Sequence, residues 1–255
     1  MNIPVEDTFF EVHEYPIGFK DPLGQEVQGN STGFKAIART NPNQVLDIVS
    51  SNYKVVTNEE VFMSIKQHTD RIGAKLVNVD MFANKRASYT FQLPDSVDVS
   101  GQEVLPRIMV KNSYDRSTSV DILAGAFVLV CSNGMVIGKT TTMKKYKHLE
   151  GTKALDSLPD IFEKVTMDFT DEFVPLLNEM DQREINQEHL LELYKWFPQQ
   201  MHDVLTDTLK RSRPKTFWQL LNVATYVLTH HSDRDKEATH KLERVVTNRI
   251  SKLMN

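Results

Sequence analysis

The residues with the most recognisable chemistry are cations and one aromatic ring that fall within ten positions of one another. Five side chains can neutralise phosphate there: Lys139, Lys144, Lys145, Lys147 and His148. Tyr146 lies among them and can stack on a base, and the three threonines at 140–142 can donate to phosphate oxygens. This combination is typical of a loop that binds single-stranded nucleic acid. A lysine-rich loop that is simply solvated is the alternative interpretation.

Charge is unevenly distributed along the chain, although the formal net charge is only −4. Residues 104–148 carry seven lysines and arginines against two carboxylates, a balance of +5. The seven are Arg107, Lys111, Arg116, Lys139, Lys144, Lys145 and Lys147. Residues 1–34 carry six carboxylates against Lys20, a balance of −5. One-sided charge favours a polyanion as the partner of the basic segment, and the alternative is two solvated surfaces.

A glycine-containing segment after an apolar strand invites comparison with a phosphate-binding loop. Gly134 and Gly138 precede Lys139 and Thr140, but only three residues separate the glycines, and Asn133 stands where the first glycine should be. A true P-loop needs four residues between its glycines so that successive N–H groups wrap the phosphates. We therefore interpret the segment as a turn leading into a basic loop.

Three other features suggest chemistry less strongly. Cys131 follows the apolar residues 128–130, which predicts a buried thiol rather than an activated nucleophile. His230 and His231, with two aspartates close behind, resemble a metal site, but we expect them in a solvated loop between helices. Trp196 and Trp218 lie in apolar helical stripes and are expected in the core. No metal or cofactor is expected.

The composition excludes several classes of protein. The chain has 255 residues, of which 40% are apolar and 25% charged, as in ordinary globular proteins. No apolar run approaches the roughly 18 residues needed to cross a bilayer, and the acidic start lacks the basic region of a secretion signal. We therefore expect a soluble protein that stays inside the cell. A single cysteine excludes an internal disulfide.

Residues 34–137 show mostly the pattern of β-strands, with one helix near the front. Strands are expected at 45–49, 53–56, 75–81, 86–93, 107–111 and 120–131, with a loop at 94–101. Thr57 and Glu60 form the signature of a capping box that opens the helix, and Gly73 ends it. The strand at 120–131 is almost continuously apolar, which predicts a central place in its sheet.

After Gly151 the pattern becomes helical. Pro175 should kink or divide the apolar segment at 161–180, while Asn186 and Thr216 cap later helices. We predict an α+β fold, with a mostly antiparallel sheet and one early helix, followed by an all-helical C-terminal part. The expected organisation is an acidic N-terminal segment at 1–34, a sheet domain at 35–150, and a helical domain at 151–255 packed on it.

Four blocks of sequence, in this order, resemble a known family. They are residues 45–60 (VLDIVSSNYKVVTNEE), 110–119 (VKNSYDRSTS), 128–134 (VLVCSNG) and 216–230 (TFWQLLNVATYVLTH). They are similar to the phage/plasmid-like family of unknown function, domain-of-unknown-function family 932, and the similarity spans most of the chain. The resemblance implies an accessory protein of a bacteriophage or other mobile element, working in a bacterial cytoplasm. It supplies no catalytic residues.

The order of elements is also similar to that of the phage single-strand annealing proteins. Those proteins form rings that hold a DNA strand in a positively charged groove, by backbone contacts and without a cofactor. The similarity is one of architecture, and architecture alone does not establish function. It implies a homo-oligomer.

Three functions compete on these observations. The first is a non-enzymatic protein that binds single-stranded DNA and promotes strand annealing in recombination or replication. Its predicted site consists of Arg107, Lys111, Arg116, Lys139, Lys144, Lys145 and Lys147 for phosphate, with Tyr146 for stacking. The second is a protein-binding phage factor that inhibits or redirects a host machine, with its acidic N-terminal segment mimicking nucleic acid or docking on a basic partner. The third is an enzyme whose site the sequence does not reveal.

Overall fold

The structure is a computed structural model. It describes residues 3–18, 20, 23–25, 32–117, 120–128, 133–135, 144–146, 156, 160, 163–164, 167, 169–231 and 236–254. The chain divides into two compact units. Unit 1 consists of Met1–Phe91, Met109–Ile122 and Lys144–Phe162, and unit 2 of Gln92–Ile108, Leu123–Met143 and Glu163–Asn255. The predicted domain boundaries at 34/35 and 150/151 stay predictions.

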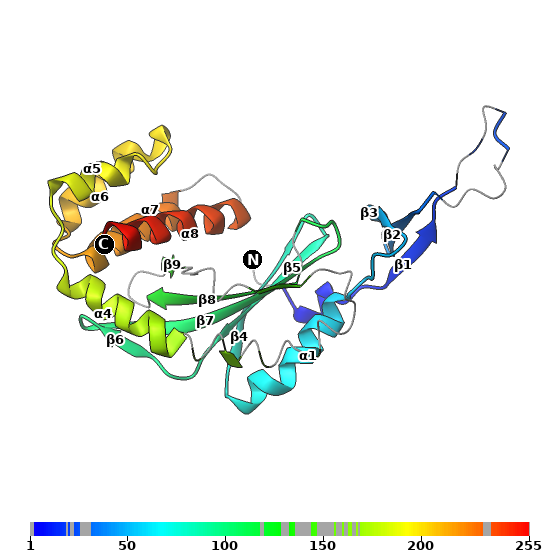
Figure 1. The fold of residues 1–255 in the computed structure, drawn as a ribbon, viewed down its shortest axis with the longest axis horizontal. Helices are drawn as coiled ribbons and strands as arrows, with labels where there is room; N and C mark the ends of the chain where they lie inside the picture. Colours follow the sequence, from blue (N-terminus) through cyan, green and yellow to red (C-terminus); the bar gives the residue numbers. More distant parts are fainter. Residues whose placement is uncertain are drawn as a thin grey trace. The chain divides into compact units, whose positions relative to one another are not determined.

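Unit 1 contains an antiparallel sheet of three strands, β1 (Val12–Pro16), β2 (Phe34–Thr40) and β3 (Asn43–Ser50), in that order (Figure 1). A register shift in the pairing of β2 with β3 leaves Leu46 as the extra residue of a bulge. One face of the sheet packs into a core formed by Ile37, Leu46, Val49, Tyr53 and Tyr114. A short 3₁₀ helix, η1 (Val5–Thr8), precedes β1.

Helix α1 (Asn58–Arg71) begins where the capping box predicts it. The Thr57 hydroxyl accepts from the Glu60 N–H at 3.1 Å, and the Glu60 carboxylate accepts from the Thr57 N–H at 2.7 Å. Val61, Phe62 and Ile65 are buried on one face. The predicted strand at 53–56 is instead an irregular connection between β3 and α1, because the Val56 carbonyl accepts from the Asn112 side chain rather than from a neighbouring strand.

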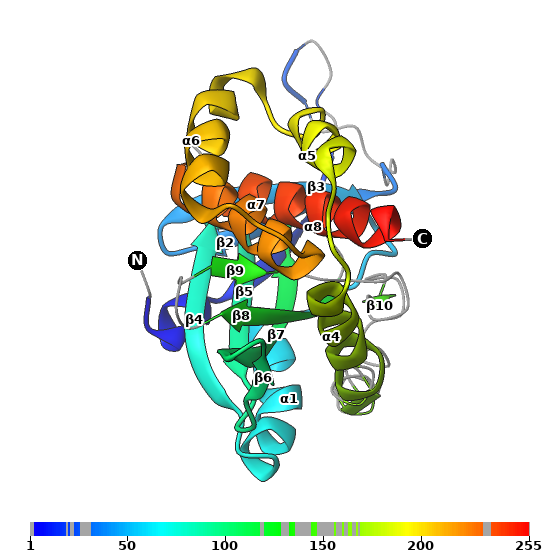
Figure 2. The same cartoon turned by 90° about the vertical axis from the view of Figure 1, so that its left-hand side faces the viewer.

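Among the described residues, the larger sheet has seven strands, and the order along its path is β10–β8–β7–β5–β4. Figure 2 labels these strands. Their bounds are β4 (Lys75–Phe82), β5 (Arg86–Gln92), β7 (Gln102–Ser113), β8 (Val120–Val128) and β10 (Lys144–Tyr146). Two short strands complete it, with β6 (Val97–Val99) on β7 and β9 (Asn133–Met135) on β8. Strand β8 is an internal strand next to the end strand β10, rather than the centre of the sheet as predicted, and residues 129–131 of the predicted strand lie outside the described residues. The predicted loop at 94–101 contains β6.

Helices form the C-terminal part, as predicted. A π-helical turn at Phe169–Phe173 is followed by α4 (Val174–Gln182), α5 (Gln187–Tyr194), the 3₁₀ turn η4 (Gln199–Met201), α6 (His202–Ser212), α7 (Phe217–His231) and α8 (Lys236–Leu253). Pro175 lies in the first turn of α4, where its missing N–H interrupts no helical hydrogen bond. The α+β fold class is confirmed. Among the described residues, no helix has the length and apolarity to span a bilayer.

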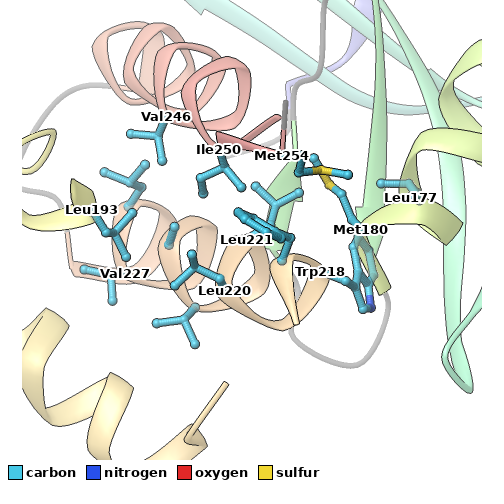
Figure 3. Packing of buried hydrophobic residues seen from close by; sticks show 14 of the residues in the cluster. Leu177, Met180, Leu193, Trp218, Leu220, Leu221, Val227, Val246, Ile250 and Met254 are labelled. Atoms are coloured by element: carbon cyan, nitrogen blue, oxygen red, sulfur yellow. The ribbon is translucent and has the colours of Figure 1, made fainter. Parts of the chain in front are cut away.

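The core of unit 2 forms around α7 (Figure 3). Trp218 is 1% exposed, and its indole N–H donates to the Gln102 side chain of β7 at 3.1 Å. Residues from α4, α5 and α8 surround α7, and those labelled in Figure 3 include Leu177, Leu193 and Ile250. Trp218 is therefore a core residue, as predicted. Trp196 packs against this core and is partly buried.

Candidate nucleic-acid interface

Strand β10 carries three of the predicted nucleic-acid-binding residues, Lys144, Lys145 and Tyr146. It pairs in antiparallel fashion with β8, so that Lys145 lies opposite Asp121. Because β10 ends the strand path of the larger sheet, these three residues lie at a sheet edge. Lysines at such an edge also discourage pairing with other chains, which is a structural use of the same residues.

Lys111 lies near this edge, on β7. Strand β8 separates β7 from β10, and neighbouring strands are about 4.8 Å apart, so β7 and β10 are roughly 10 Å apart. The Lys111 side chain is half-buried. Lys111 and β10 both belong to unit 1. Lys111 therefore lies in the same unit as Lys144, Lys145 and Tyr146, with one strand of the sheet between them.

The end of β7 and the residue after it, Tyr114, are held by hydrogen bonds to the first residue of α1. The Asn58 N–H donates to the Tyr114 hydroxyl at 2.8 Å, and the Asn112 amide donates to the Asn58 side chain at 2.9 Å. All of these groups are buried. Residues 45–60 and the described residues 110–117, which belong to two of the blocks that carry the family resemblance, are thus joined by hydrogen bonds.

Arg116 lies in the segment after β7 in a left-handed conformation, with φ +58°. Its guanidinium binds the Asp47 carboxylate through Nε at 2.5 Å and Nη2 at 3.2 Å, and this hydrogen bonding raises the Arg116 pKa. The neighbouring Asp115 accepts from Arg86 Nε at 2.9 Å. Burial raises the pKa of Asp115, but hydrogen bonds from Ser117 and Arg86 outweigh it and hold that pKa below its usual value. Arg116 is therefore an ion-paired residue rather than an isolated cation.

Arg107 and the lysines of β10 belong to different units. Arg107 belongs to unit 2, where its half-buried guanidinium donates to the Gln92 side chain at 3.3 Å, and burial lowers its pKa. Lys139 and Lys147 lie outside the described residues, as do Cys131 and His148. Their predicted roles stay predictions.

A groove in unit 1 contains a cation, Lys54, that is not among the predicted nucleic-acid-binding residues. The groove has a volume of about 630 Å³ and is lined by Glu14, Lys35 and residues 51–55. Lys35 binds Glu14 at 2.6 Å, whereas the Lys54 side chain is exposed. The signal for it was present in the sequence, because Ser51, Asn52 and Lys54 form a polar stretch directly after β3. Tyr53, which also lines the groove, is buried, and burial raises the pKa of its hydroxyl group.

The histidine pair lies elsewhere than predicted. His230 and His231 are the last two residues of α7, not part of a loop, and their rings lie 4.8 and 5.6 Å from the Tyr226 ring. The predicted loop position was wrong because α7, with its apolar stripe, continues through both histidines. Within the described part of the chain, no group of three or more histidine, cysteine or carboxylate residues is placed to hold a metal ion.

Comparison with known proteins identifies a family. A family model described as "Domain of unknown function (DUF932)" matches residues 45–249, and the chain belongs to this family. Neither the curated proteins nor the solved structures yielded a match.

Proposed function

We propose that this member of the DUF932 family binds single-stranded DNA without catalysis, as an accessory protein of a phage or other mobile element. Strand annealing during recombination or replication in a bacterial cytoplasm is the role that this activity would serve. The observation that supports the proposal is the pairing of β10 with β8, which puts Lys144, Lys145 and Tyr146 at one sheet edge with Lys111 two strands away.

The chemistry of this edge suits a single strand. Lysines contact the backbone without reading sequence, and a tyrosine can stack on any unpaired base. A base inside a duplex is already stacked on both sides and offers no such face. Lys54 in the groove of unit 1 is a further cation of the same unit.

Fluorescence anisotropy with a short labelled single strand, measured at two salt concentrations, tests the proposal. If Lys111, Lys144 and Lys145 each neutralise one phosphate, log K falls with log[salt] with a slope of about −2. The variant K144A/K145A is expected to lower the slope to about −0.7 and to weaken binding about tenfold or more at low salt. Tyr146→Ala should weaken binding by about 5- to 100-fold and leave the slope unchanged.

The matched control removes two lysines from unit 2. Lys210 and Lys252 are exposed in the last turns of α6 and α8, and K210A/K252A changes the net charge by the same amount. It should bind as the wild type does. Absence of binding, binding that ignores salt, or equal losses in the two double variants would contradict the proposal.

A second candidate function is binding to a basic host protein through the acidic N-terminal segment. Glu6, Asp7 and Glu11 are exposed there, whereas Glu14 is paired with Lys35. Three carboxylates on a short stretch can dock on a basic partner. The titration above separates the two candidates, because this one requires no affinity for DNA.

A further inference from the structure

The three-stranded sheet of unit 1 has two faces of different character. Residues directly opposite each other on paired strands share a face, and Tyr15, Ala36 and Ile48 form one such row. The next row on the same face includes Ala38 and Val45. We call this face the outer face. Its apolar residues are Tyr15, Phe34, Ala36, Ala38, Val45 and Ile48, and the register also places His13, Thr40, Asn43 and Ser50 on it.

The outer face is apolar although it is open to solvent. Tyr15, Phe34, Val45 and Ile48 are 48%, 54%, 58% and 50% exposed, whereas Ile37 on the opposite face is fully buried. The solvated face of an antiparallel sheet usually carries polar side chains. Contiguous exposed apolar residues mark a site of interaction.

Charge excludes a polyanion as the occupant. The outer face contains no lysine or arginine, because the two cations of β2 belong to the opposite face. There Lys35 binds Glu14 at 2.6 Å, and the Arg39 guanidinium lies 4.4 Å from the centre of the Phe10 ring. His13 neighbours Tyr15 on the outer face and lies 3.1 Å from the Glu11 carboxylate. DNA or an anionic bilayer would find no compensating charge on this face.

The shape and size of the outer face suit a second copy of the chain. The middle strand β2 presents the small residues Ala36 and Ala38 between the larger residues of β1 and β3. A near-neutral face can meet its own copy without repulsion between like charges. Four half-exposed side chains offer roughly 100 Å² each, which gives about 800–1,000 Å² for two copies with the alanines included.

We propose that the outer face is the interface of a two-fold symmetric homodimer, in which it packs against the same face of a second copy. A symmetric interface requires a self-complementary surface, and two apolar sheet faces can pack on each other as the sheets of a β-sandwich do. The buried area lies at the low end for specific interfaces, so dissociation constants of about 10 μM to 1 mM are expected.

Sedimentation velocity on the full chain without nucleic acid, over that concentration range, tests the dimer. The wild type should shift from monomer to dimer, and Ile48→Lys should stay monomeric at every concentration. Met63→Lys is the matched control, because Met63 is 55% exposed on α1 of the same unit. It should dimerise as the wild type does.

Circular dichroism checks that each variant is folded. If Ile48→Lys fails to fold, Val45→Thr, which keeps the shape and adds a hydroxyl, should still weaken the dimer by about threefold to tenfold. A wild type that stays monomeric, a dimer that survives both changes on β3, or a dimer that Met63→Lys weakens equally would overturn the proposal. The experiment is independent of DNA binding.

Discussion

Glu243 is an ionisable residue that lies in an apolar environment. Its side chain is 1% exposed on α8, and one carboxylate oxygen accepts from the Thr229 hydroxyl at 2.8 Å. The other oxygen has no hydrogen-bond partner among the residues that the structure describes. Burial raises the pKa of Glu243 to about 7. The folded chain therefore holds a proton on this carboxyl up to nearly neutral pH, whereas the unfolded chain releases it near pH 4.5.

Replacing Glu243 with glutamine should remove a pH dependence of stability. Between pH 4.5 and 7 the carboxyl of Glu243 ionises in the unfolded chain, which lowers the free energy of the unfolded state, while it stays protonated in the folded chain. The stability of the wild type therefore falls as pH rises through this range. The advantage of Glu243→Gln should grow by about 2 kcal/mol from pH 5 to pH 7.5. Urea unfolding of both proteins at these two pH values measures it. A difference that is the same at both would show that the carboxyl is not buried as described.

Single-residue contacts were the least predictable part of the candidate site. Lys144, Lys145 and Tyr146 were predicted as a group because they are adjacent in the chain. The pairing of Arg116 with Asp47 joins residues 69 positions apart, and no local pattern signals it. Asn58 and Tyr114 likewise meet only through the fold. The distribution of charge along the sequence therefore predicted Arg116 as a phosphate-binding cation, whereas in the structure its guanidinium is paired with the Asp47 carboxylate.

At the level of elements, the first turn of α1 depends on its capping box. Thr57→Ala removes the hydroxyl that accepts from the Glu60 N–H, leaving that donor without its protein partner. We expect a loss of about 1 kcal/mol in the free energy of unfolding. Thr57→Ser keeps the hydroxyl and is the control. Urea unfolding that finds the two variants equally stable would contradict this role.

Elements with a local signal were predictable, and elements defined by distant pairing were less so. The caps at Thr57 and Asn186 and the proline at 175 each act within one helical turn, and the structure confirms them. The short strand β6 exists because it pairs with β7, and its own three residues carry little pattern. Strand β10 also owes its definition to its partner, β8.

At the level of the whole molecule, net charge works against the proposed ligand. The chain carries −4 at pH 7 and has an isoelectric point near 6.1, so its overall field repels DNA. Binding must then come from local cations strong enough to overcome that field. Because the isoelectric point is near 6.1, the net charge is close to zero at pH 6.

A change of pH separates the effect of the overall charge on DNA binding from the effect of the lysines of β10. Lowering pH from 8 to 6 at constant ionic strength should tighten binding to single-stranded DNA by about threefold to tenfold. The wild type and K144A/K145A should tighten by the same factor, because both lose the same repulsion, so the ratio of their dissociation constants stays constant. Anisotropy titrations at the two pH values give that ratio. A ratio that falls to one at pH 6 would mean that general charge, rather than the lysines of β10, governs the affinity.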